Sequence, residues 1–258
     1  MNIKLSAVVI TFNEEKNIRR CLASLAEVAD EIIIVDSFST DRTEEICKEF
    51  DCDFRTNPFE GHIQQKNFAL QQASNDFILS LDADEELSEK LIKSILEAKS
   101  DWKYDAYYFN RLSSYCGKFF PHGSWYPDQK IRLFDKRLSK WGGTNPHDKI
   151  VLSTNSKKFL KGDLLHYTYH TIEEHIKQIN YFSGIAAKAA YDKGKRFNIL
   201  KLIFKPFWRF FRDYFLKHGF LGGIRGLTIC LLTAVETYLK IIKLWELERA
   251  EKLNQKPN

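Results

Sequence analysis

The chain has 258 residues, of which 44% are hydrophobic and 28% are charged, values that exclude a largely disordered protein. Its net charge of +5 is unevenly distributed: residues 1–100 carry 11 Lys and Arg against 20 Asp and Glu, and residues 101–258 carry 28 against 14. We therefore expect the first part to attract multivalent cations, and the second to attract phosphate groups or an anionic membrane surface.

The five cysteines are odd in number and lack Cys-x-x-Cys spacing. This pattern argues against a disulfide framework and against a zinc site, and it favours a reducing compartment. The N-terminal segment MNIKLSAVVITFNEE has no charged stretch followed by a cleavable apolar one. We therefore expect no signal peptide and a cytoplasmic protein.

The first hundred residues alternate between apolar, β-branched runs and segments with apolar residues at helical spacing. The predicted strands are 5–11, 31–36, 52–56 and 76–82, and the predicted helices are 14–28, 41–50, 62–73 and 88–98. Asp41 with Glu44 is typical of a capping box, and Ser88 is the expected cap of the fourth helix. The alternation predicts an α/β fold with a mainly parallel central sheet, whose ligands bind at the carboxyl ends of the strands.

From residue 104 to about 168 the pattern changes to short β-like pieces between turn-rich stretches, which could complete the sheet and cover a substrate. From residue 172 the chain is predicted to be helical, with helices at 172–192, 198–217 and 224–249. We therefore expect a domain at 1–170, divided into halves at about 1–100 and about 101–170. A helical extension at 171–258 follows.

Residues 193–217 contain eight Lys and Arg and one acid, interleaved with aromatic and aliphatic residues. One interpretation is a helix on an anionic membrane surface; the other is a packed helix with a solvated basic face. The longest uncharged run that follows, GLTICLLTAV, is half of the roughly 20 residues that a transmembrane helix needs. We therefore expect surface association at most, and no membrane span.

The segment FILSLDADEEL places four carboxylates at the end of the fourth predicted strand. Asp82 and Asp84 can converge on Mg²⁺ or Mn²⁺ and on the phosphates that such an ion binds. Glu85 and Glu86 are instead expected to favour the start of the next helix through its dipole.

Asp36 ends the second predicted strand, where an acid can accept hydrogen bonds from a ribose or a base. It could alternatively cap the loop DSFSTD. The first turn, TFNEEKN, lacks a glycine fingerprint, which argues against a nicotinamide or flavin cofactor.

Taken together and in this order along the chain, these motifs resemble those of glycosyltransferase family 2, which has the GT-A fold of nucleotide-sugar transferases. The resemblance covers roughly residues 4–150 and rests on VVITFNEEKNIRRCLASL, DEIIIVDSFSTDRT, QQKNFALQQASNDFILSLDADE and YPDQKIRLF with NPHDK. Within the family the chain is most similar to bacterial β-glucosyltransferases of lipopolysaccharide core assembly. The resemblance implies a metal-dependent, inverting transfer of glucose or a related hexose from a UDP-sugar to a lipopolysaccharide-core or other cell-surface glycan.

The resemblance implies that about 1–100 is the nucleotide-binding half of a GT-A-like domain at 1–170, and that about 101–170 is the half that completes the acceptor and metal sites. It also implies roles for individual residues. Those expected to bind the nucleotide-sugar are Thr11, Asn13, Glu14, Asp36, Lys66 and Asp82. Asp84 would ligate the divalent metal that bridges the diphosphate, and Asp82 would assist the nucleotide or the metal.

The catalytic base is expected in NPHDK, because the chain lacks the Glu-Asp pair and the Gln-x-x-Arg-Trp that many family members carry. NPHDK resembles the His-Glu pair of the lipopolysaccharide branch, with Asp in the Glu position. The resemblance implies Asp148 as the base and His147 as a metal or diphosphate ligand. Alternatively, His147 hydrogen-bonds within its loop and Asp148 forms a salt bridge. Arg132 could face the diphosphate or the acceptor, or form a structural ion pair.

Two other functions stay open from the residues alone. A sugar-nucleotide pyrophosphorylase would normally show a Gly-rich, Lys- or Arg-bearing first loop, which TFNEEKN does not provide. A non-enzymatic protein that binds nucleic acid or a membrane surface is compatible with the positive net charge. Because no nucleic-acid motif is present, we expect no nucleic-acid partner. The expected partners are a UDP-sugar donor, a glycan or lipid-linked acceptor and the inner membrane surface.

Overall fold

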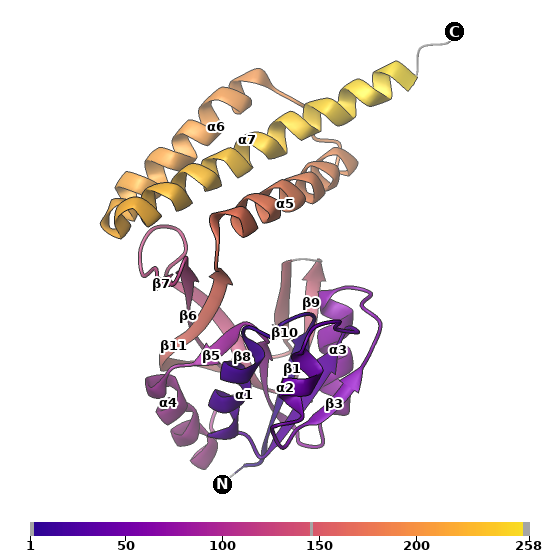
Figure 1. Ribbon diagram of the computed structural model, residues 1–258, viewed down its shortest axis with the longest axis vertical. Coiled ribbons are helices and arrows are strands. Elements are labelled where there is room, and N and C mark those ends of the chain that lie inside the picture. The colour runs from indigo at the N-terminus through magenta and orange to yellow at the C-terminus, as the bar shows by residue number, and fades with distance from the viewer. Residues whose placement is uncertain (1–2, 145–146, 255–258) are drawn as a thin grey trace. The chain divides into compact units, whose positions relative to one another are not determined.

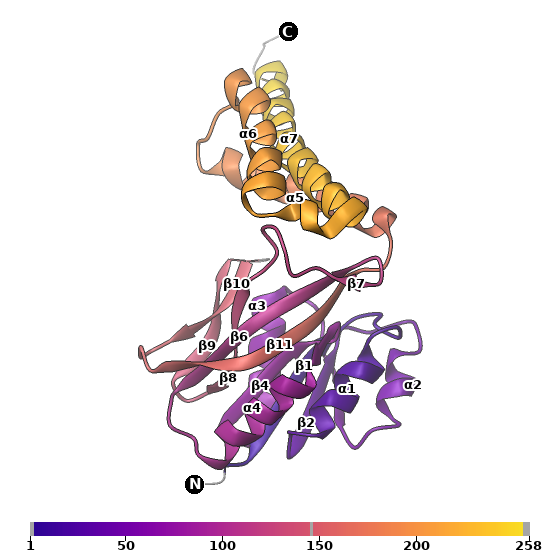
Figure 2. The same ribbon diagram turned by 90° about the vertical axis from the view of Figure 1, so that its left-hand side faces the viewer.

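The computed structural model describes residues 3–144 and 147–254, with side chains for all of these except 147 and 252–254. The chain forms two compact units (Figure 1, Figure 2). Unit 1 comprises Met1–Leu112 and Asp128–Tyr167, and unit 2 comprises Ser113–Pro127 and Thr168–Asn258.

Unit 1 is built on a sheet whose first part is parallel. Its strands are β1 (Leu5–Thr11), β2 (Glu31–Asp36), β3 (Asp53–Thr56) and β4 (Phe77–Asp82), in the order β3-β2-β1-β4. Two of the four predicted strands match these bounds, and the other two differ by one residue at the start. The α/β prediction is confirmed, and all four strands end at the edge where the predicted site residues lie.

The sheet continues beyond β4 with antiparallel pairs. The added strands are β8 (Asp128–Asp135), β6 (Ala106–Tyr115), β11 (Lys157–Tyr169) and β5 (Glu85–Leu87), in that order, with the short β7 (Lys118–Phe119) on β6. A separate antiparallel pair is formed by β9 (Ser139–Thr144) and β10 (His147–Leu152). These strands extend the sheet and bring residues far along the chain to the end of β4.

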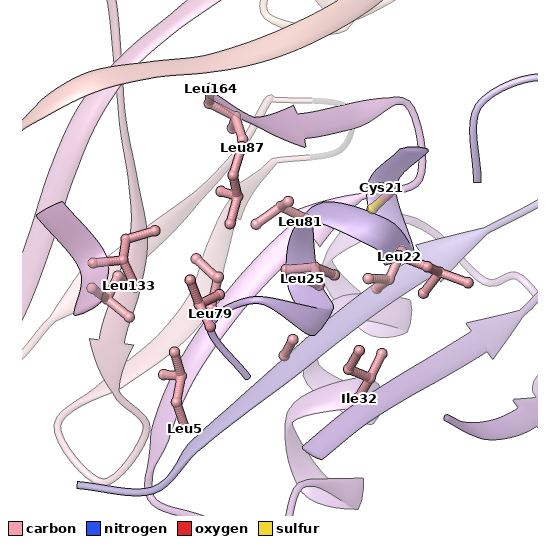
Figure 3. Packing of buried hydrophobic residues seen from close by; sticks show 14 of the residues in the cluster. Leu5, Cys21, Leu22, Leu25, Ile32, Leu79, Leu81, Leu87, Leu133 and Leu164 are labelled. Atoms are coloured by element: carbon pink, nitrogen blue, oxygen red, sulfur yellow. The ribbon is translucent and has the colours of Figure 1, made fainter. Parts of the chain in front are cut away.

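Helices cover both faces of the parallel strands, as expected when strand residues are apolar on both sides. The helices of unit 1 are α1 (Ile18–Ala26), α2 (Thr43–Cys47), α3 (His62–Gln72) and α4 (Glu89–Ser100). Successive strand residues point to opposite faces. Leu5 and Leu79 therefore share one core with Leu22 and Leu25 of α1, and Figure 3 shows this packing. Residues from the alternate positions form a second core with α3 and the β9–β10 pair.

The predicted helix caps had different outcomes. Ser88 caps α4 as expected, because its Oγ accepts a hydrogen bond from the backbone N of Leu91 at 3.4 Å. The Asp41 cap is wrong, because α2 begins two residues later, at Thr43. The Asp41 carboxylate accepts hydrogen bonds from the backbone N and hydroxyl of Thr43 and from the backbone N of Glu15. The carboxylate thus binds both the first residue of α2 and the loop after β1, and the expected capping box with Glu44 is not formed.

Unit 2 contains the helices α5 (Ile172–Asp192), α6 (Ile199–Phe211) and α7 (Gly223–Asn254). A π-helical turn at Arg212–Leu216 and a 3₁₀ turn at Gly219–Gly222 connect α6 to α7. α7 packs against both α5 and α6. In the described part of the chain, no helix combines the length and the apolar character that a membrane crossing requires.

Candidate active site

The loops after β1 and β2 are joined by side-chain hydrogen bonds. Asn13 adopts a positive φ of 54°, and its Oδ1 accepts a hydrogen bond from the backbone N of Thr40 at 2.8 Å. The buried Asp36 accepts two hydrogen bonds from Ser39, at 2.7 Å from the backbone N and 2.5 Å from Oγ. Both oxygens of Asp36 thus bond within the loop DSFSTD, and each keeps a further lone pair for a ligand.

Thr11 and Glu14 lie in and just after β1, and both have polar groups withdrawn from water. The Thr11 hydroxyl is buried without a hydrogen-bond partner in the described part of the chain. The Glu14 carboxylate accepts a hydrogen bond from Asn17 at 2.8 Å. Burial, and next the nearby Asp84 carboxylate, raise the pKa of Glu14 to about 7. A cation placed between Glu14 and Asp84 would favour the ionised form of both carboxylates.

Asp82 lies between two cationic side chains at the end of β4. The Lys66 Nζ of α3 is 2.9 Å from Asp82 Oδ1, and a guanidinium nitrogen of Arg132 on β8 is 2.7 Å from Oδ2. Burial by itself would raise the pKa of Asp82, but Arg132 and Lys66 outweigh it and hold that pKa well below its usual range. Asp82 is therefore ionised in the folded protein.

Glu85 takes part in the same buried network, which corrects its expected role at a helix start. It lies in β5 and is fully buried, and it accepts hydrogen bonds from Arg132 at 2.7 Å and from the backbone N of Asp82 at 3.0 Å. Arg111 of β6 approaches Glu85 at 3.4 Å and also pairs with Asp128. β5 exists because this segment pairs with β11, a long-range contact that sequence spacing does not reveal. Glu86 lies in β5 too, and accepts a hydrogen bond from the Tyr167 hydroxyl at 2.6 Å.

Asp148, the predicted base, lies in β10 and contacts Lys66 as well. The Lys66 Nζ is 2.8 Å from its Oδ2, so one ammonium joins Asp82 and Asp148. The same ammonium lies 4.3 Å from the centre of the Trp141 ring, a distance typical of a cation–π interaction. The backbone of His147 belongs to β10, but its side chain lies outside the described residues.

A pocket of about 560 Å³ opens beside this network. It is lined by Lys66, Asp82, Arg111, Gln129, Lys130, Ile131, Arg132, Trp141, Asp148, Lys149 and Ile150. Cations outnumber carboxylates in this lining, and an indole ring forms part of the wall. Such a pocket can hold an anionic group beside the apolar face of a sugar.

Asp84 points toward a histidine that the sequence analysis did not single out. Its Oδ2 lies 3.1 Å from Nε2 of His166 on β11. No group of three His, Cys, Asp or Glu side chains converges as a metal site among the described residues. Two protein ligands nevertheless suit Mg²⁺ or Mn²⁺, which commonly complete their coordination with water and substrate phosphates. Asp84 could hold such an ion through a carboxylate oxygen, and His166 lies close enough to be a second ligand.

Three residues of the site had no local signal in the sequence: Glu85, Trp141 and His166. Glu85 stands among other acids before a helix, Trp141 lies in a turn-rich stretch, and His166 is an isolated histidine in a β-like segment. Only the pairing of β5 with β11 and the position of β9 bring them to the end of β4.

Comparison with known proteins agrees with this architecture. The model of the family described as "Glycosyl transferase family 2" matches residues 6–161. An uncharacterised glycosyltransferase of Rickettsia typhi is 31% identical over 255 residues, which is 95% of this chain and 87% of the relative. The lipopolysaccharide core biosynthesis glycosyltransferase LpsC of Rhizobium meliloti is 30% identical over 256 residues, which is 95% of this chain and 93% of LpsC.

Among solved structures, TarS of Staphylococcus aureus has a similar fold. The superposition has a TM-score of 0.50 with 18% sequence identity, and it covers 70% of this chain and 39% of TarS. The two proteins are therefore similar in fold, and this similarity agrees with the GT-A-like arrangement of the strands.

Proposed function

This chain belongs to glycosyl transferase family 2, and we propose that it transfers glucose or a related hexose, with inversion, from a UDP-sugar to a lipopolysaccharide-core or other cell-surface glycan. The observation that carries the proposal is the position of Lys66, which joins Asp82 at the end of β4 to Asp148 in the same pocket. The expected donor-binding acid and the expected base are thus separated by one side chain.

The donor would bind at the carboxyl ends of β1, β2 and β4. The buried Thr11 hydroxyl and the free lone pairs of Asp36 provide polar partners for the nucleoside. Asp82 is paired on both sides in this structure, so we propose that it positions Lys66 and Arg132 for the diphosphate. The guanidinium plane of Arg132 suits such an anion.

Asp84 and His166 would hold a divalent cation, which would neutralise charge on the departing diphosphate. His147 remains a second proposed metal or diphosphate ligand. Burial and the charge on Asp84 keep Glu14 easily protonated without a cation nearby. A divalent cation on Asp84 would offset this repulsion and favour the ionised form of Glu14.

Asp148 would accept the proton of the acceptor hydroxyl as that oxygen attacks the anomeric carbon. Its bond to Lys66 holds one carboxylate oxygen, Oδ2, and among the described residues no hydrogen bond to Oδ1 is seen, so Oδ1 could take the proton. Trp141 would provide a flat apolar surface for a sugar ring. Attack on the face opposite the diphosphate inverts the anomeric centre.

The acceptor and the cellular location are inferred from likeness to LpsC, whose name states lipopolysaccharide core biosynthesis. A lipid-linked acceptor would place the protein in the cytoplasm, at the inner face of the cytoplasmic membrane.

The proposal can be tested by incubating the protein with individual UDP-sugars, Mn²⁺ and truncated lipopolysaccharide cores, and measuring UDP release together with the mass of the glycan. We expect one UDP-hexose to give a glycan heavier by one hexose. The same UDP-sugar should raise the melting temperature with Mn²⁺ present, since a ligand that binds only the folded state stabilises it.

Asp84→Ala tests the site assignment, with Asp53→Ala on the exposed side of β3 as the matched control. We expect the first variant to lose transfer and Mn²⁺-dependent UDP binding, and the second to keep both. Unchanged transfer by Asp84→Ala would show that the site is wrongly assigned. Release of pyrophosphate from a nucleoside triphosphate would instead identify a pyrophosphorylase.

A further inference from the structure

Helix α6 of unit 2 exposes an unusually large apolar surface. None of its residues is buried. Its exposed apolar side chains, each at least 36% accessible, are Ile199, Leu200, Ile203, Phe204, Phe207, Trp208 and Phe211. Exposed large apolar residues are normal when scattered, but a contiguous apolar patch marks a surface that binds something.

These side chains lie on one side of the helix. At 3.6 residues per turn, the seven positions project within about half of the circumference. Leu202, Pro206 and Phe210 are only partly exposed, and they fit the side that packs on α7. They project within an arc of about 80° that overlaps the Ile199 edge of the half described above. The apolar face of α6, defined by these seven exposed residues, therefore lies outside the packed arc except at that edge.

Basic residues border this apolar face. Lys201 and Lys205 project beside Trp208, and α6 contains no acidic residue. Both lysines are exposed and form no ion pair among the described residues, whereas Arg209 pairs with the buried Asp213 at 2.6 Å. The two lysines are thus free to meet an external anion.

The turn that follows α6 extends the apolar character. Phe215, Leu216, Phe220, Leu221 and Ile224 are all at least 43% exposed. They occupy the π-helical turn, the 3₁₀ turn and the start of α7. Figure 1 and Figure 2 show that α6 and α7 lie side by side and meet at this turn. One end of unit 2 therefore presents apolar side chains from three consecutive segments.

We propose that the apolar face of α6 and the following turn form a docking surface for an anionic lipid bilayer. The aromatic and aliphatic side chains would enter the interfacial region, while Lys201 and Lys205 would reach the headgroup phosphates. Helix α6 has 13 residues, which can lie flat in the interface. Self-association is the less favoured alternative, because α6 offers no carboxylate to pair with the lysines of a second copy. The surface lies outside the donor pocket, so this inference does not depend on sugar transfer.

The test is co-sedimentation of the full chain with vesicles of phosphatidylcholine alone and of phosphatidylcholine mixed with phosphatidylglycerol. We expect binding to the mixed vesicles and little binding to the neutral ones. Lys201→Glu with Lys205→Glu should weaken binding more than tenfold, because each lysine near an anionic bilayer contributes about fivefold. Lys90→Glu with Lys93→Glu, two exposed lysines of α4, changes the net charge equally and should have a much smaller effect.

Phe207→Ser with Trp208→Ser should abolish binding to the mixed vesicles, whereas Phe59→Ser with Leu96→Ser removes exposed apolar residues from unit 1 and should not. All of these positions are exposed, so the variants are expected to fold, and circular dichroism checks this. Binding by the Phe207/Trp208 variant equal to that of the unmodified chain would overturn the proposal. So would a dimer in vesicle-free analytical ultracentrifugation that this variant dissociates, because the face would then be a self-association interface.

Discussion

Lys66 and Asp148 are 82 positions apart in the sequence, yet the Lys66 Nζ donates a 2.8 Å hydrogen bond to Asp148 Oδ2. Lys66 comes from α3 and Asp148 from β10, and the second core holds these two elements on the same face of the sheet. The contact joins the carboxylate expected to act as base to the cation expected to face the nucleotide. Substitution of either residue should therefore affect both binding and chemistry, in ways that the following experiments separate.

Asp148→Asn should lower the rate of sugar transfer by about 10²–10⁴-fold, because the amide cannot accept a proton as a carboxylate does. The amide oxygen can still accept the hydrogen bond from Lys66, so UDP-sugar binding and melting temperature should change little. Initial rates and a thermal-shift titration measure the two effects. Asp148→Glu, which restores the residue type expected in this branch of the family, should keep much of the activity. Transfer by Asp148→Asn at half the normal rate or more would exclude Asp148 as the base.

Lys66→Met should destabilise the protein by about 2 kcal/mol at pH 7, because it leaves the half-buried charge of Asp82 with one cation in place of two. The depressed pKa of Asp82 contributes stability above its unfolded-state pKa of 3.8, and this stability is lost as the pH falls below that value. Without Lys66 the pKa is less depressed, so the difference between variant and unmodified chain should shrink as the pH falls through the folded-state pKa of Asp82 in the variant.

Urea unfolding at a series of pH values measures this difference. Lys48→Met, which removes an exposed partner of Glu44, is the matched control and should change stability little at any pH. A destabilisation by Lys66→Met that shows no decrease even at pH values where Asp82 of the folded variant is protonated would show that the lysine acts through packing, without coupling to Asp82.

Glu85→Gln should lower the free energy of unfolding by about 3 kcal/mol, because the buried Arg132 guanidinium loses one of its two carboxylate partners among the described residues. Asp82 is the one that stays. Glu45→Gln breaks the exposed pair with Arg42 and should have no measurable effect. Urea unfolding measures both changes in unfolding free energy. They follow from the shift in the midpoint urea concentration, provided that the slope of free energy against urea concentration is the same for each protein. Equal effects of the two substitutions would contradict the structural role assigned to Glu85.

His175 provides a pH prediction in unit 2. Its side chain is 3% exposed, and its Nδ1 lies 3.2 Å from the Tyr115 hydroxyl. Burial lowers the pKa of His175 to about 4 from a usual 6.5. Between these values the unfolded chain binds a proton at this position and the folded chain does not. Stability should therefore fall by about 2 kcal/mol as the pH falls from 6.5 to 4.

His175→Phe should remove this part of the pH dependence while keeping an aromatic ring beside Tyr169. His170→Phe, at an exposed position, serves as the control and should leave the pH dependence unchanged. Unfolding curves at several pH values give the slope for each protein. An unchanged slope in His175→Phe would assign the acid sensitivity of unit 2 to other groups.

The sequence by itself determined the strands and helices whose signal is local. Strands 5–11 and 31–36 were predicted with the observed bounds, because β-branched apolar runs bounded by polar turns define a buried parallel strand. The Ser88 cap and the three C-terminal helices also followed from short-range patterns. Asp82 and Asp84 could be selected because Asp82 ends such a strand and Asp84 comes two residues later. The ordered motifs were sufficient to identify the family.

Only the tertiary structure decided which carboxylate has which partner. Asp82, Asp84 and Glu85 are near neighbours in the sequence, yet the first lies between Lys66 and Arg132, the second faces His166, and the third is buried against Arg132. These partners lie on α3, β8 and β11, and the sheet order brings them to the end of β4. Sequence spacing describes which residues share a strand or a helix face. The energy of a buried charge depends on which distant cation reaches it, and the packing of the whole sheet determines that.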